Sequence, residues 1–434
     1  MQTNFSLAQL ADPNIAVADT ILRACVHCGF CQATCPTYVL LGDELDSPRG
    51  RIYLIKDMLE HDRAATEEVV THIDRCLSCL ACMTTCPSGV HYMHLVDHAR
   101  AHIHETYTRP LMDQLMRVFL AYVMPYPRRL RLAMIAGVLG KPLAPVMAAL
   151  GLKPLAAAAR LAPSRAPGAM TEPGVYPASG SRKGRVALLG GCANEALSPS
   201  ITQATIRLLN RHGVEVVVAP DAGCCGSLEH HIGHEEGALA KARANIDAWM
   251  GEIEGQGLDA ILITISGCGT TVKDYGFMLR TDAIYAPRAA RISSLARDVS
   301  EYLAKLGIQQ PAKPSGLTVA YHSACSLQHG QRVHREPKDV LVACGFVVRD
   351  IPEAHLCCGS AGTYNILQPD IAGRLRDRKI TNIAKTGPDI IAAGNIGCIT
   401  QIASGTATPV VHVVELADWA TGGPVPEQLK GRVG

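Results

Sequence analysis

The chain has 434 residues, with 41 Lys and Arg against 39 Asp and Glu, and a formal charge of +2 that argues against a polyanionic partner such as nucleic acid. This length can bury a large core without disulfides and suggests about three domains. Seventeen cysteines in repeated spacings indicate thiols that stay reduced until metal is inserted, so we expect a cytoplasmic protein. Residues 1–19 lack the pattern of a secretory signal.

The first predicted elements are a short helix within residues 1–20 and then two cysteine motifs. Both motifs read C-x2-C-x2-C-x3-C-P, and the second follows the first by fifty-one residues. This is the bacterial ferredoxin spacing for two 4Fe–4S clusters, in which the fourth cysteine of each motif ligates the other cluster. We therefore predict two crossed ligand sets: Cys25, Cys28, Cys31 and Cys86 for one cluster, and Cys76, Cys79, Cys82 and Cys35 for the second.

Structural zinc sites and disulfides are the alternatives for these cysteines. Zinc also prefers thiolates, but structural zinc sites use two C-x2-C pairs and not a triple run with a distant fourth ligand. Disulfides are disfavoured because the chain is long and the spacing is too tight for most of these cysteines to pair. Two iron–sulfur clusters are the better interpretation.

The ferredoxin-like domain is predicted to span residues 1–108. A helix is expected over residues 46–59, where Arg49 and Arg51 either compensate the charge of the clusters or are solvated surface arginines. A second helix is expected over residues 90–104, which carries five histidines. We interpret these histidines as a solvated or partner-facing surface and not as a metal site, because the cysteines already account for metal here.

Residues 109–162 are predicted to form short amphipathic helices separated by prolines. Their apolar faces need a partner, which is the rest of this chain, another subunit or a membrane surface with the basic residues at the lipid head groups. No membrane span is expected, because arginines, lysines and prolines interrupt the apolar sequence. Residues 163–184 are rich in Pro and Gly and are predicted to be a linker.

Beyond the linker, apolar runs that end in Gly and Cys alternate with helical patterns, which predicts parallel α/β units. The cysteines indicate that this half is duplicated, as module 185–310 and module 311–434. Each module places its sulfurs at the carboxyl ends of strands, where open α/β sheets bind ligands. The predicted cofactor-binding residues are Cys192, Cys224, Cys225 and Cys268 in the first module and Cys325, Cys357, Cys358 and Cys398 in the second.

The adjacent cysteine pair of each module suits an iron–sulfur cluster better than a tetrahedral zinc, so we predict a further cluster in at least one module. Zinc and a redox dithiol remain alternatives. Cys344 lies outside the repeat and is predicted to be a buried apolar residue. His322 and His355 lie close to the cysteines in sequence and could donate to a cluster sulfur or carry a proton, but a structural hydrogen bond is the preferred role.

Together, the two ferredoxin motifs and the two cysteine-cysteine-glycine modules resemble iron–sulfur subunits that pair with a flavoprotein to oxidise small 2-hydroxy acids. Similar modules occur in anaerobic glycerol-3-phosphate dehydrogenase and in heterodisulfide reductase. One departure is that each module here closes with a single cysteine and not with C-x2-C, which counts against the noncubane cluster of heterodisulfide reductase. Longer stretches are similar to the bacterial glycolate oxidase iron–sulfur subunit, namely residues 72–79, 85–90, 266–269 and 355–364.

The resemblance implies a fold of the α+β and α/β classes: a mainly helical two-cluster ferredoxin-like domain, then a duplicated parallel α/β domain. It also implies an electron-transfer subunit of a glycolate oxidase or dehydrogenase, which takes electrons from FAD-binding partner subunits and passes them to a membrane quinone or similar acceptor. No catalytic residue is expected, since no G-x-G-x-x-G follows a strand and opens a helix. The expected location is cytoplasmic or peripheral on the inner face of the cell membrane.

Three alternatives to this function remain open. A related D-lactate or anaerobic glycerol-3-phosphate dehydrogenase would use the same electron-carrying chain, because the substrate is chosen in another polypeptide. A heterodisulfide-reductase-like catalyst would use the cysteine-rich modules for thiol chemistry on a substrate. A zinc-stabilised scaffold would hold flavin subunits in place without carrying electrons in its α/β half.

Overall fold

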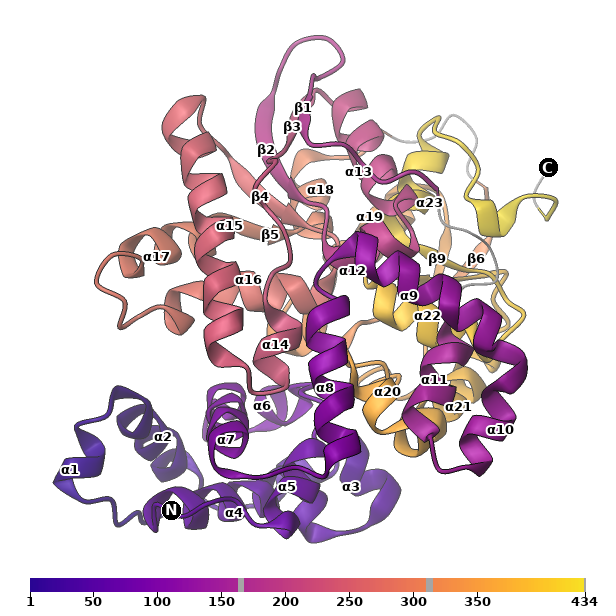
Figure 1. The fold of residues 1–434 in the computed structure, drawn as a ribbon. Helices are drawn as coiled ribbons and strands as arrows, with labels where there is room; N and C mark the ends of the chain where they lie inside the picture. Colours follow the sequence, from indigo (N-terminus) through magenta and orange to yellow (C-terminus); the bar gives the residue numbers. More distant parts are fainter. Residues whose placement is uncertain (163–167, 310–314, 433–434) are drawn as a thin grey trace.

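The computed structural model describes residues 1–162, 168–309 and 315–432. Its chain runs from a helical N-terminal domain through the helices of residues 111–161 to two α/β modules (Figure 1). The predicted fold class is confirmed. The N-terminal domain lies against the modules at the ends where their cysteine loops gather, so all the cysteine motifs come close to one another.

Short helices and two cysteine loops form the N-terminal domain. Its helices are α1 (Leu7–Leu10), α2 (Pro13–Ala24), η1 (Phe30–Gln32), α3 (Pro36–Leu41), η2 (Glu44–Asp46), α4 (Pro48–Glu60), α5 (Glu67–Asp74), α6 (Ala81–Thr85) and α7 (Tyr92–Thr106). The helix predicted over residues 46–59 is present as α4, which begins with Pro48 because Ser47 caps it by accepting a hydrogen bond from the Gly50 N–H. The apolar faces of α2, α4, α5 and α7 share one core.

The helices predicted for residues 109–162 are present as α8 (Leu111–Val123), α9 (Pro127–Gly140), η3 (Lys141–Leu143), α10 (Ala144–Ala149) and α11 (Lys153–Leu161). One feature differs from the sequence expectation: α9, η3 and α10 continue as a single 23-residue helix, Pro127–Ala149. Pro142 and Pro145 are tolerated because each lies at the first positions of η3 or α10. By length and composition alone, this helix is apolar enough to cross a membrane.

The two modules share the same strand order. The first sheet runs β1-β3-β2-β4-β5 and the second runs β7-β6-β8-β9, and every pairing is parallel except that of β1 with β3. The strands are β1 (Gly174–Tyr176), β2 (Gly184–Leu189), β3 (Val214–Val218), β4 (Ala260–Ile263), β5 (Ala296–Asp298), β6 (Thr318–His322), β7 (Val347–Asp350), β8 (Ile390–Ala393) and β9 (Val410–His412). The duplication read from the cysteines is therefore present in the topology.

Helices cover both sheets. In the first module they are α12 (Cys192–Leu197), α13 (Ser200–Arg211), α14 (Ser227–His231), α15 (Glu235–Gly255), α16 (Ser266–Met278), α17 (Ala286–Leu295) and α18 (Val299–Leu306). In the second they are η4 (Ser326–Gly330), α19 (Glu336–Ala343), α20 (Tyr364–Leu367), α21 (Pro369–Ala384), α22 (Ile396–Ala403), α23 (Val413–Ala420) and η5 (Glu427–Leu429). Cys344 is fully buried in the core that the modules share, as predicted.

The segment predicted to be a linker contributes a strand. Within it, β1 pairs antiparallel with β3, with Gly174 opposite Val218, so this part of the chain is an edge of the first sheet. The start of the predicted linker, at residues 163–167, lies outside the described residues. The predicted boundary between the modules also lies outside them, at residues 310 and 311.

The histidine face of α7 is partly covered by the same chain: His91 and His104 are exposed, as expected of a solvated surface, but His94 is not. His94 Nε2 lies 2.9 Å from a carboxylate oxygen of Asp274, and its ring stacks on Phe277 of α16. The ring of His104 packs against His234 at the start of α15. Periodicity placed these histidines on one face, but the partner of that face lies about 180 residues away.

A buried histidine joins the two modules. His412, at the end of β9, has no exposed surface; its Nδ1 accepts from the Val414 N–H at 3.2 Å, which leaves Nε2 to donate to the Thr264 carbonyl at 2.9 Å. This pattern requires a neutral ring, and burial lowers the pKa of His412 to about 4. Protonation would remove the Nδ1 acceptor, and with it the hydrogen bond from Val414 N–H that caps the start of α23.

The free energy of unfolding is therefore expected to fall as the pH drops from about 6.5 to 4. In this range His412 is protonated in the unfolded chain but stays neutral in the folded chain. The full loss is on the order of 3 kcal/mol. His412→Gln should make this part of the pH profile of the urea midpoint less steep, with the remaining slope due to His98 and His329, whose pKa values burial also lowers to about 4. His334→Gln, at an exposed position, should leave the profile unchanged. A profile in His412→Gln as steep as that of the parent would contradict the assignment.

Candidate metal centres

The first ferredoxin motif forms a surface loop whose thiols face one small cavity. Cys25, Cys28 and Cys31 line it together with Cys82 and Cys86 of the second motif, so the two motifs meet here as crossed ligand sets require, although Cys82 belongs to the other predicted set. The loop turns at Gly29, whose φ of +83° favours glycine. Cys28 is exposed, so one edge of this site reaches the surface.

The thiols of the second motif lie deeper. The Arg51 guanidinium points to Cys35 Sγ at 3.8 Å, and the Tyr92 hydroxyl points to Cys76 Sγ at the same distance. Burial raises the pKa of the Cys82 thiol well above its usual range, and the neighbouring Cys79, Cys76 and Cys35 add to this effect. Crowded, buried thiols are stabilised when a metal takes the place of their protons. The set fits a cluster, and the ligand assignment stays a prediction.

The two arginines of α4 have different roles. Arg51 is buried and donates to the His72 carbonyl at 2.7 Å and to the Thr37 hydroxyl at 3.0 Å, beside the second site. Its charge is balanced by Asp46, which is fully buried. Arg49 is half-buried and pairs with Glu44 at 2.8 Å. Of the two interpretations offered for these arginines, Arg51 therefore fits compensation of cluster charge and not a solvated surface position.

In each cysteine-rich module, four sulfurs gather at the carboxyl ends of neighbouring strands, as predicted. In the first, Cys192 follows β2, Cys224 and Cys225 follow β3, and Cys268 lies in the first turn of α16 after β4. The Sγ atoms of Cys192 and Cys224 are 3.8 Å apart. The hydrogen bonds from the Cys192 and Cys225 thiols hold the pKa of Cys224 well below its usual range.

The second module repeats this arrangement, with Cys325 Sγ and Cys357 Sγ 3.6 Å apart. The glycine after each cysteine pair is required by packing as well as by conformation. Gly226 and Gly359 both have φ near +86°, which favours glycine. A Cβ on Gly226 would lie within 3 Å of the Ala238 carbonyl oxygen in α15, and a Cβ on Gly359 would lie within 3 Å of the Ala372 carbonyl oxygen in α21. The cysteine-cysteine-glycine motif therefore places two thiols beneath a closely packed helix.

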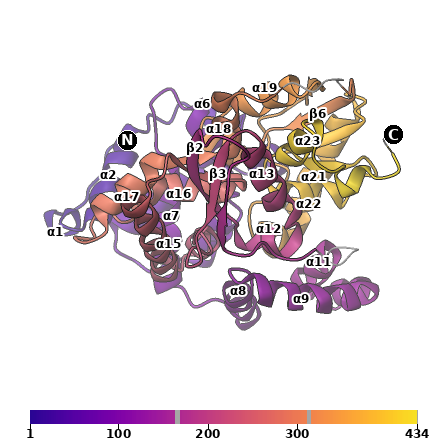
Figure 2. The same cartoon turned by 90° about the horizontal axis from the view of Figure 1, so that it is seen from above.

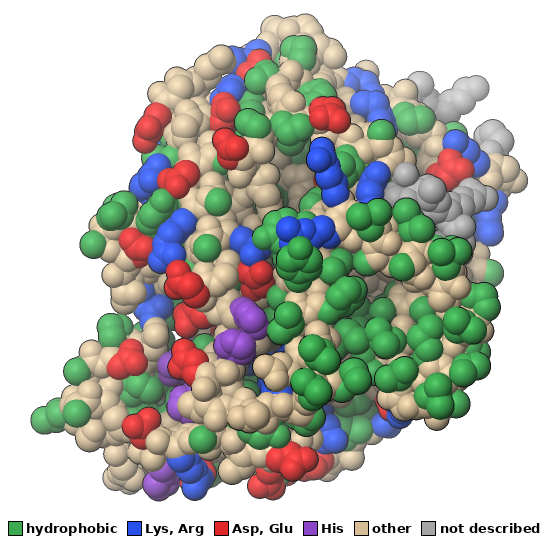
Figure 3. Space-filling model, viewed as in Figure 1, with side chains coloured by type: hydrophobic (Ala, Val, Ile, Leu, Met, Phe, Trp, Pro, Cys, Tyr) green, Lys and Arg blue, Asp and Glu red, His purple; other side chains and the backbone are tan. Residues whose placement is uncertain are grey.

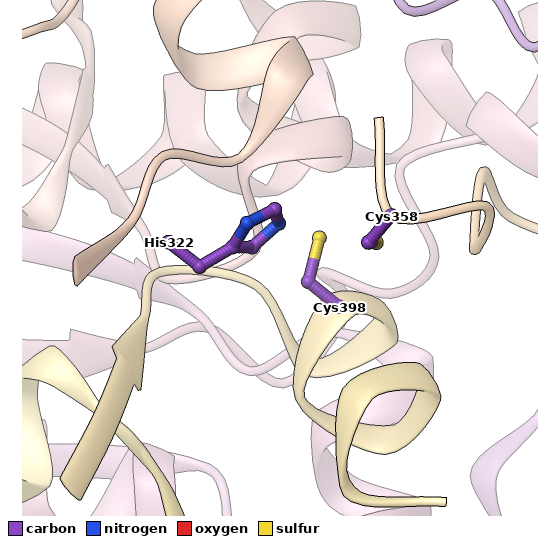
Figure 4. Close-up of side chains that lie close together, drawn as sticks. All are labelled: His322, Cys358 and Cys398. Atoms are coloured by element: carbon purple, nitrogen blue, oxygen red, sulfur yellow. The ribbon is translucent and has the colours of Figure 1, made fainter. Parts of the chain in front are cut away.

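A histidine faces the second set of sulfurs (Figure 4). The side-chain ligand atoms of His322, Cys358 and Cys398 all lie within 4.8 Å of one another. His322 is buried, and neither ring nitrogen has a hydrogen-bond partner among the described residues, so the structural hydrogen bond expected for it was wrong. His355 is not part of this group.

A cavity of about 820 Å³ joins the sites. It is lined by Cys76 of the ferredoxin-like domain, by cysteines of both modules, and on its other side by α8, α9 and α11. Beside it, Cys79 and Cys357 pack in one apolar cluster between the domains. Sequence analysis did not predict this cavity, because its walls come from four separate parts of the chain.

Comparisons with known proteins agree with this geometry. A 4Fe–4S dicluster domain family matches residues 21–90, and a cysteine-rich domain family matches residues 186–273 and 319–403. A hypothetical protein from Helicobacter pylori shares the fold, with a TM-score of 0.55 over 96% of this chain and 74% of that chain at 9% identity.

Two curated relatives match nearly the whole chain. It is 44% identical to the glycolate oxidase iron–sulfur subunit of Escherichia coli (strain K12) over 97% of this chain and 99% of the relative. It is 31% identical to the probable glycolate oxidase iron–sulfur subunit of Bacillus subtilis (strain 168) over 92% and 93%. Lactate utilization protein A of Exiguobacterium is 24% identical over 53% of this chain. The chain belongs to the family of glycolate oxidase iron–sulfur subunits, which are oxidoreductase components.

Proposed function

We propose that this chain takes electrons from FAD-binding partner subunits, which oxidise glycolate to glyoxylate, and delivers them to a membrane quinone. Overall, glycolate loses two electrons and two protons, and quinone gains two electrons and two protons to become quinol. The two predicted ferredoxin ligand sets would hold 4Fe–4S clusters, which supply one-electron carriers when bound. The observation that carries the proposal is that cysteines lie both at the protein surface, where Cys28 is exposed, and in the wall of the large cavity beside α8–α11, where Cys76 and cysteines of both modules gather.

The first ferredoxin site is the proposed entry point. Cys28 is exposed, and the neighbouring side chains of Val26 and Phe30 are 65% and 62% exposed. Apolar side chains around a reachable redox site suit a protein partner, since such residues are concentrated in the buried centres of interfaces. We therefore assign the flavin subunits to this end of the chain.

The inner part of the route passes from the ferredoxin-like domain to the second module. Cys79 and Cys357 lie in the same apolar cluster, and Tyr364 of α20 donates to the Arg75 carbonyl at 3.0 Å across this contact. A rigid, dry contact keeps two redox sites at a fixed separation. We propose that the second module holds a further iron–sulfur cluster, with zinc as the competing outcome.

The helices α8–α11 are the proposed membrane face. They lie along one side of the molecule, and apolar side chains gather over them (Figures 2 and 3). After Asp113 in the first turn of α8, all charged residues of this stretch are basic, since no acidic residue occurs before Glu172. Basic, apolar helices bind at the surface of anionic membranes. The exposed apolar side chains are Leu111, Met112, Leu115, Val118, Phe119, Tyr122, Tyr126, Leu132, Ile135, Val138, Leu139, Leu143, Val146, Leu150 and Leu155.

The cavity under these helices suits a quinone in size and lining. Ligand pockets are typically roughly 300–1,000 Å³ and mostly apolar with a few polar groups. Leu120, Met134 and Leu155 line the outer wall of this cavity, and cysteines of both modules line its inner wall. An apolar acceptor that enters from the lipid would therefore come close to the sulfur sites.

The test uses the chain assembled with its flavin subunits, added to phosphatidylglycerol vesicles that contain a quinone. Ile135 and Leu139 are 60% and 75% exposed. Replacing both by Asp removes about 3 kcal/mol or more of lipid burial, so vesicle binding should weaken by at least about 100-fold. Glycolate-dependent quinone reduction should fall with it, while reduction of a water-soluble dye persists.

Ile284→Asp is the matched control, because Ile284 is 70% exposed but lies in the first module, away from α8–α11. It should bind vesicles and reduce quinone like the parent. Quinone reduction that is unchanged in the double variant would overturn the membrane face. Failure of the intact complex to reduce any quinone, with dye reduction retained, would overturn the proposed acceptor.

A further inference from the structure

His322 is an unpartnered polar group in the interior. It ends β6 with 1% of its surface exposed, and its ring points toward the sulfurs of Cys358 and Cys398 (Figure 4). Leaving a buried hydrogen-bonding group unsatisfied costs about 1–3 kcal/mol. An imidazole nitrogen is a common metal ligand, so the placement of this ring beside two thiols suits a metal site.

The fold itself does not require a histidine at this position. Three residues before the first cysteine, the first module has Leu189 where the second has His322. The residue paired with each on the neighbouring strand also differs, since Leu189 lies opposite Ile263 whereas His322 lies opposite Ala393. The small Ala393 leaves room for the ring. The two modules thus share a backbone and differ at the polar group that faces the sulfurs.

A second difference concerns charge. Asn245 in the first module and Lys379 in the second occupy equivalent positions. Each lies seven residues after the alanine, Ala238 or Ala372, that packs against the glycine of the cysteine-cysteine-glycine motif. Asn245 bonds to the Cys224 carbonyl at 3.0 Å, whereas Lys379, 2% exposed, donates to the Glu353 carbonyl at 2.9 Å within electrostatic reach of Cys357 and Cys358. A buried cation reduces the cost of gathering several thiolates. The first module also has a lysine, Lys241, within electrostatic reach of Cys224, so His322 is the difference that adds a metal donor to the second module.

We propose that His322 is a protein ligand of the metal centre in the second module, adding one imidazole nitrogen to the sulfurs of Cys325, Cys357, Cys358 and Cys398. This inference rests on the proposed binding of metal by that module. The first module, with Leu189 in place of His322, has sulfur donors alone. An imidazole ligand is neutral, whereas a thiolate is negatively charged, so an iron–sulfur centre with a histidine at this position has a higher reduction potential than one with a cysteine there.

The test is nitrogen hyperfine coupling in the reduced, full-length chain purified anaerobically with 15N-labelled histidine. A histidine nitrogen bound to iron gives a strong 15N coupling in pulsed EPR, and if the site holds zinc, X-ray absorption at the zinc edge reports mixed nitrogen and sulfur ligands. His322→Leu, which copies Leu189, should lose this nitrogen. His355→Gln should retain it, because His355 lies near the cysteines without facing them. His322→Cys should lower the potential of the second-module centre.

Three results would overturn the assignment, and they are distinguishable. If Cys357→Ser lowers the iron or zinc content but the parent shows no bound histidine nitrogen, metal binding stands and His322 is not a ligand. If Cys357→Ser leaves both metal contents unchanged, the second module holds no metal, and the proposed metal binding fails together with His322. A nitrogen signal that persists in His322→Leu also excludes this residue.

Discussion

A Cys79→Ser variant, purified anaerobically, is expected to lose about four irons per chain, the content of one cluster. Cys79 is 8% exposed and packs against Cys357, at the contact between the ferredoxin-like domain and the second module. Burial raises the pKa of its thiol well above the usual range, and the charge of Cys325 adds to this, so only a bound metal would keep it deprotonated. A serine hydroxyl is a much poorer ligand for iron.

Electron delivery should fail at the same position. In the assembled complex, glycolate should still reduce the flavin, but quinone reduction should slow by at least about 100-fold. Loss of a residue that only supports a metal ligand can already reduce activity by roughly this factor, and Cys79 is predicted to be a ligand itself. Cys344→Ser is the control, since Cys344 is equally buried but lies outside every motif. It should keep full iron and full quinone reduction. A Cys79→Ser chain with normal iron and normal quinone reduction would remove Cys79 from the proposed path.

Local sequence was sufficient for the ligand motifs and for the duplication. Cysteines three residues apart must share a loop, and repeated cysteines 133 residues apart imply repeated strands, so the parallel sheets follow from spacing and periodicity. These inferences need no knowledge of which segments meet. The same holds for α4, whose N-cap and initial proline are adjacent in sequence.

The sequence could not show which distant surfaces meet. The covering of His94 in α7 was not predicted, because Asp274 and Phe277, which contact it, are remote in the chain. The strand β1 was hidden in a segment rich in Pro and Gly, because an edge strand of three residues has almost no periodicity of its own. His322 was noticed, but its proximity to Cys358 and Cys398 depends on three neighbouring strand ends.

Asp46→Asn is expected to destabilise the ferredoxin-like domain by about 3–5 kcal/mol. Asp46 is fully buried, and its carboxylate contacts the Arg51 guanidinium at 3.4 Å, His72 Nδ1 at 2.9 Å and the Arg75 guanidinium at 2.9 Å. Asparagine keeps the shape but removes the negative charge, which leaves the buried Arg51 cation without its acid. The cost is large because a charge in the interior has no water to replace its partner.

Hydrogen exchange of the α4 and α5 amides measures this loss locally, since these helices carry Arg51 and His72. Glu44→Gln is the matched control: Glu44 also pairs with an α4 arginine, at 2.8 Å, but its side chain is 44% exposed, so its pair contributes about 0–1 kcal/mol. Equal effects of the two substitutions would mean that burial does not decide the strength of these pairs. If only Asp46→Asn reduces the protection from hydrogen exchange, the buried Asp46 carboxylate holds the Arg51 guanidinium beside Cys35. Asp46 would then keep a positive charge next to the second cluster site.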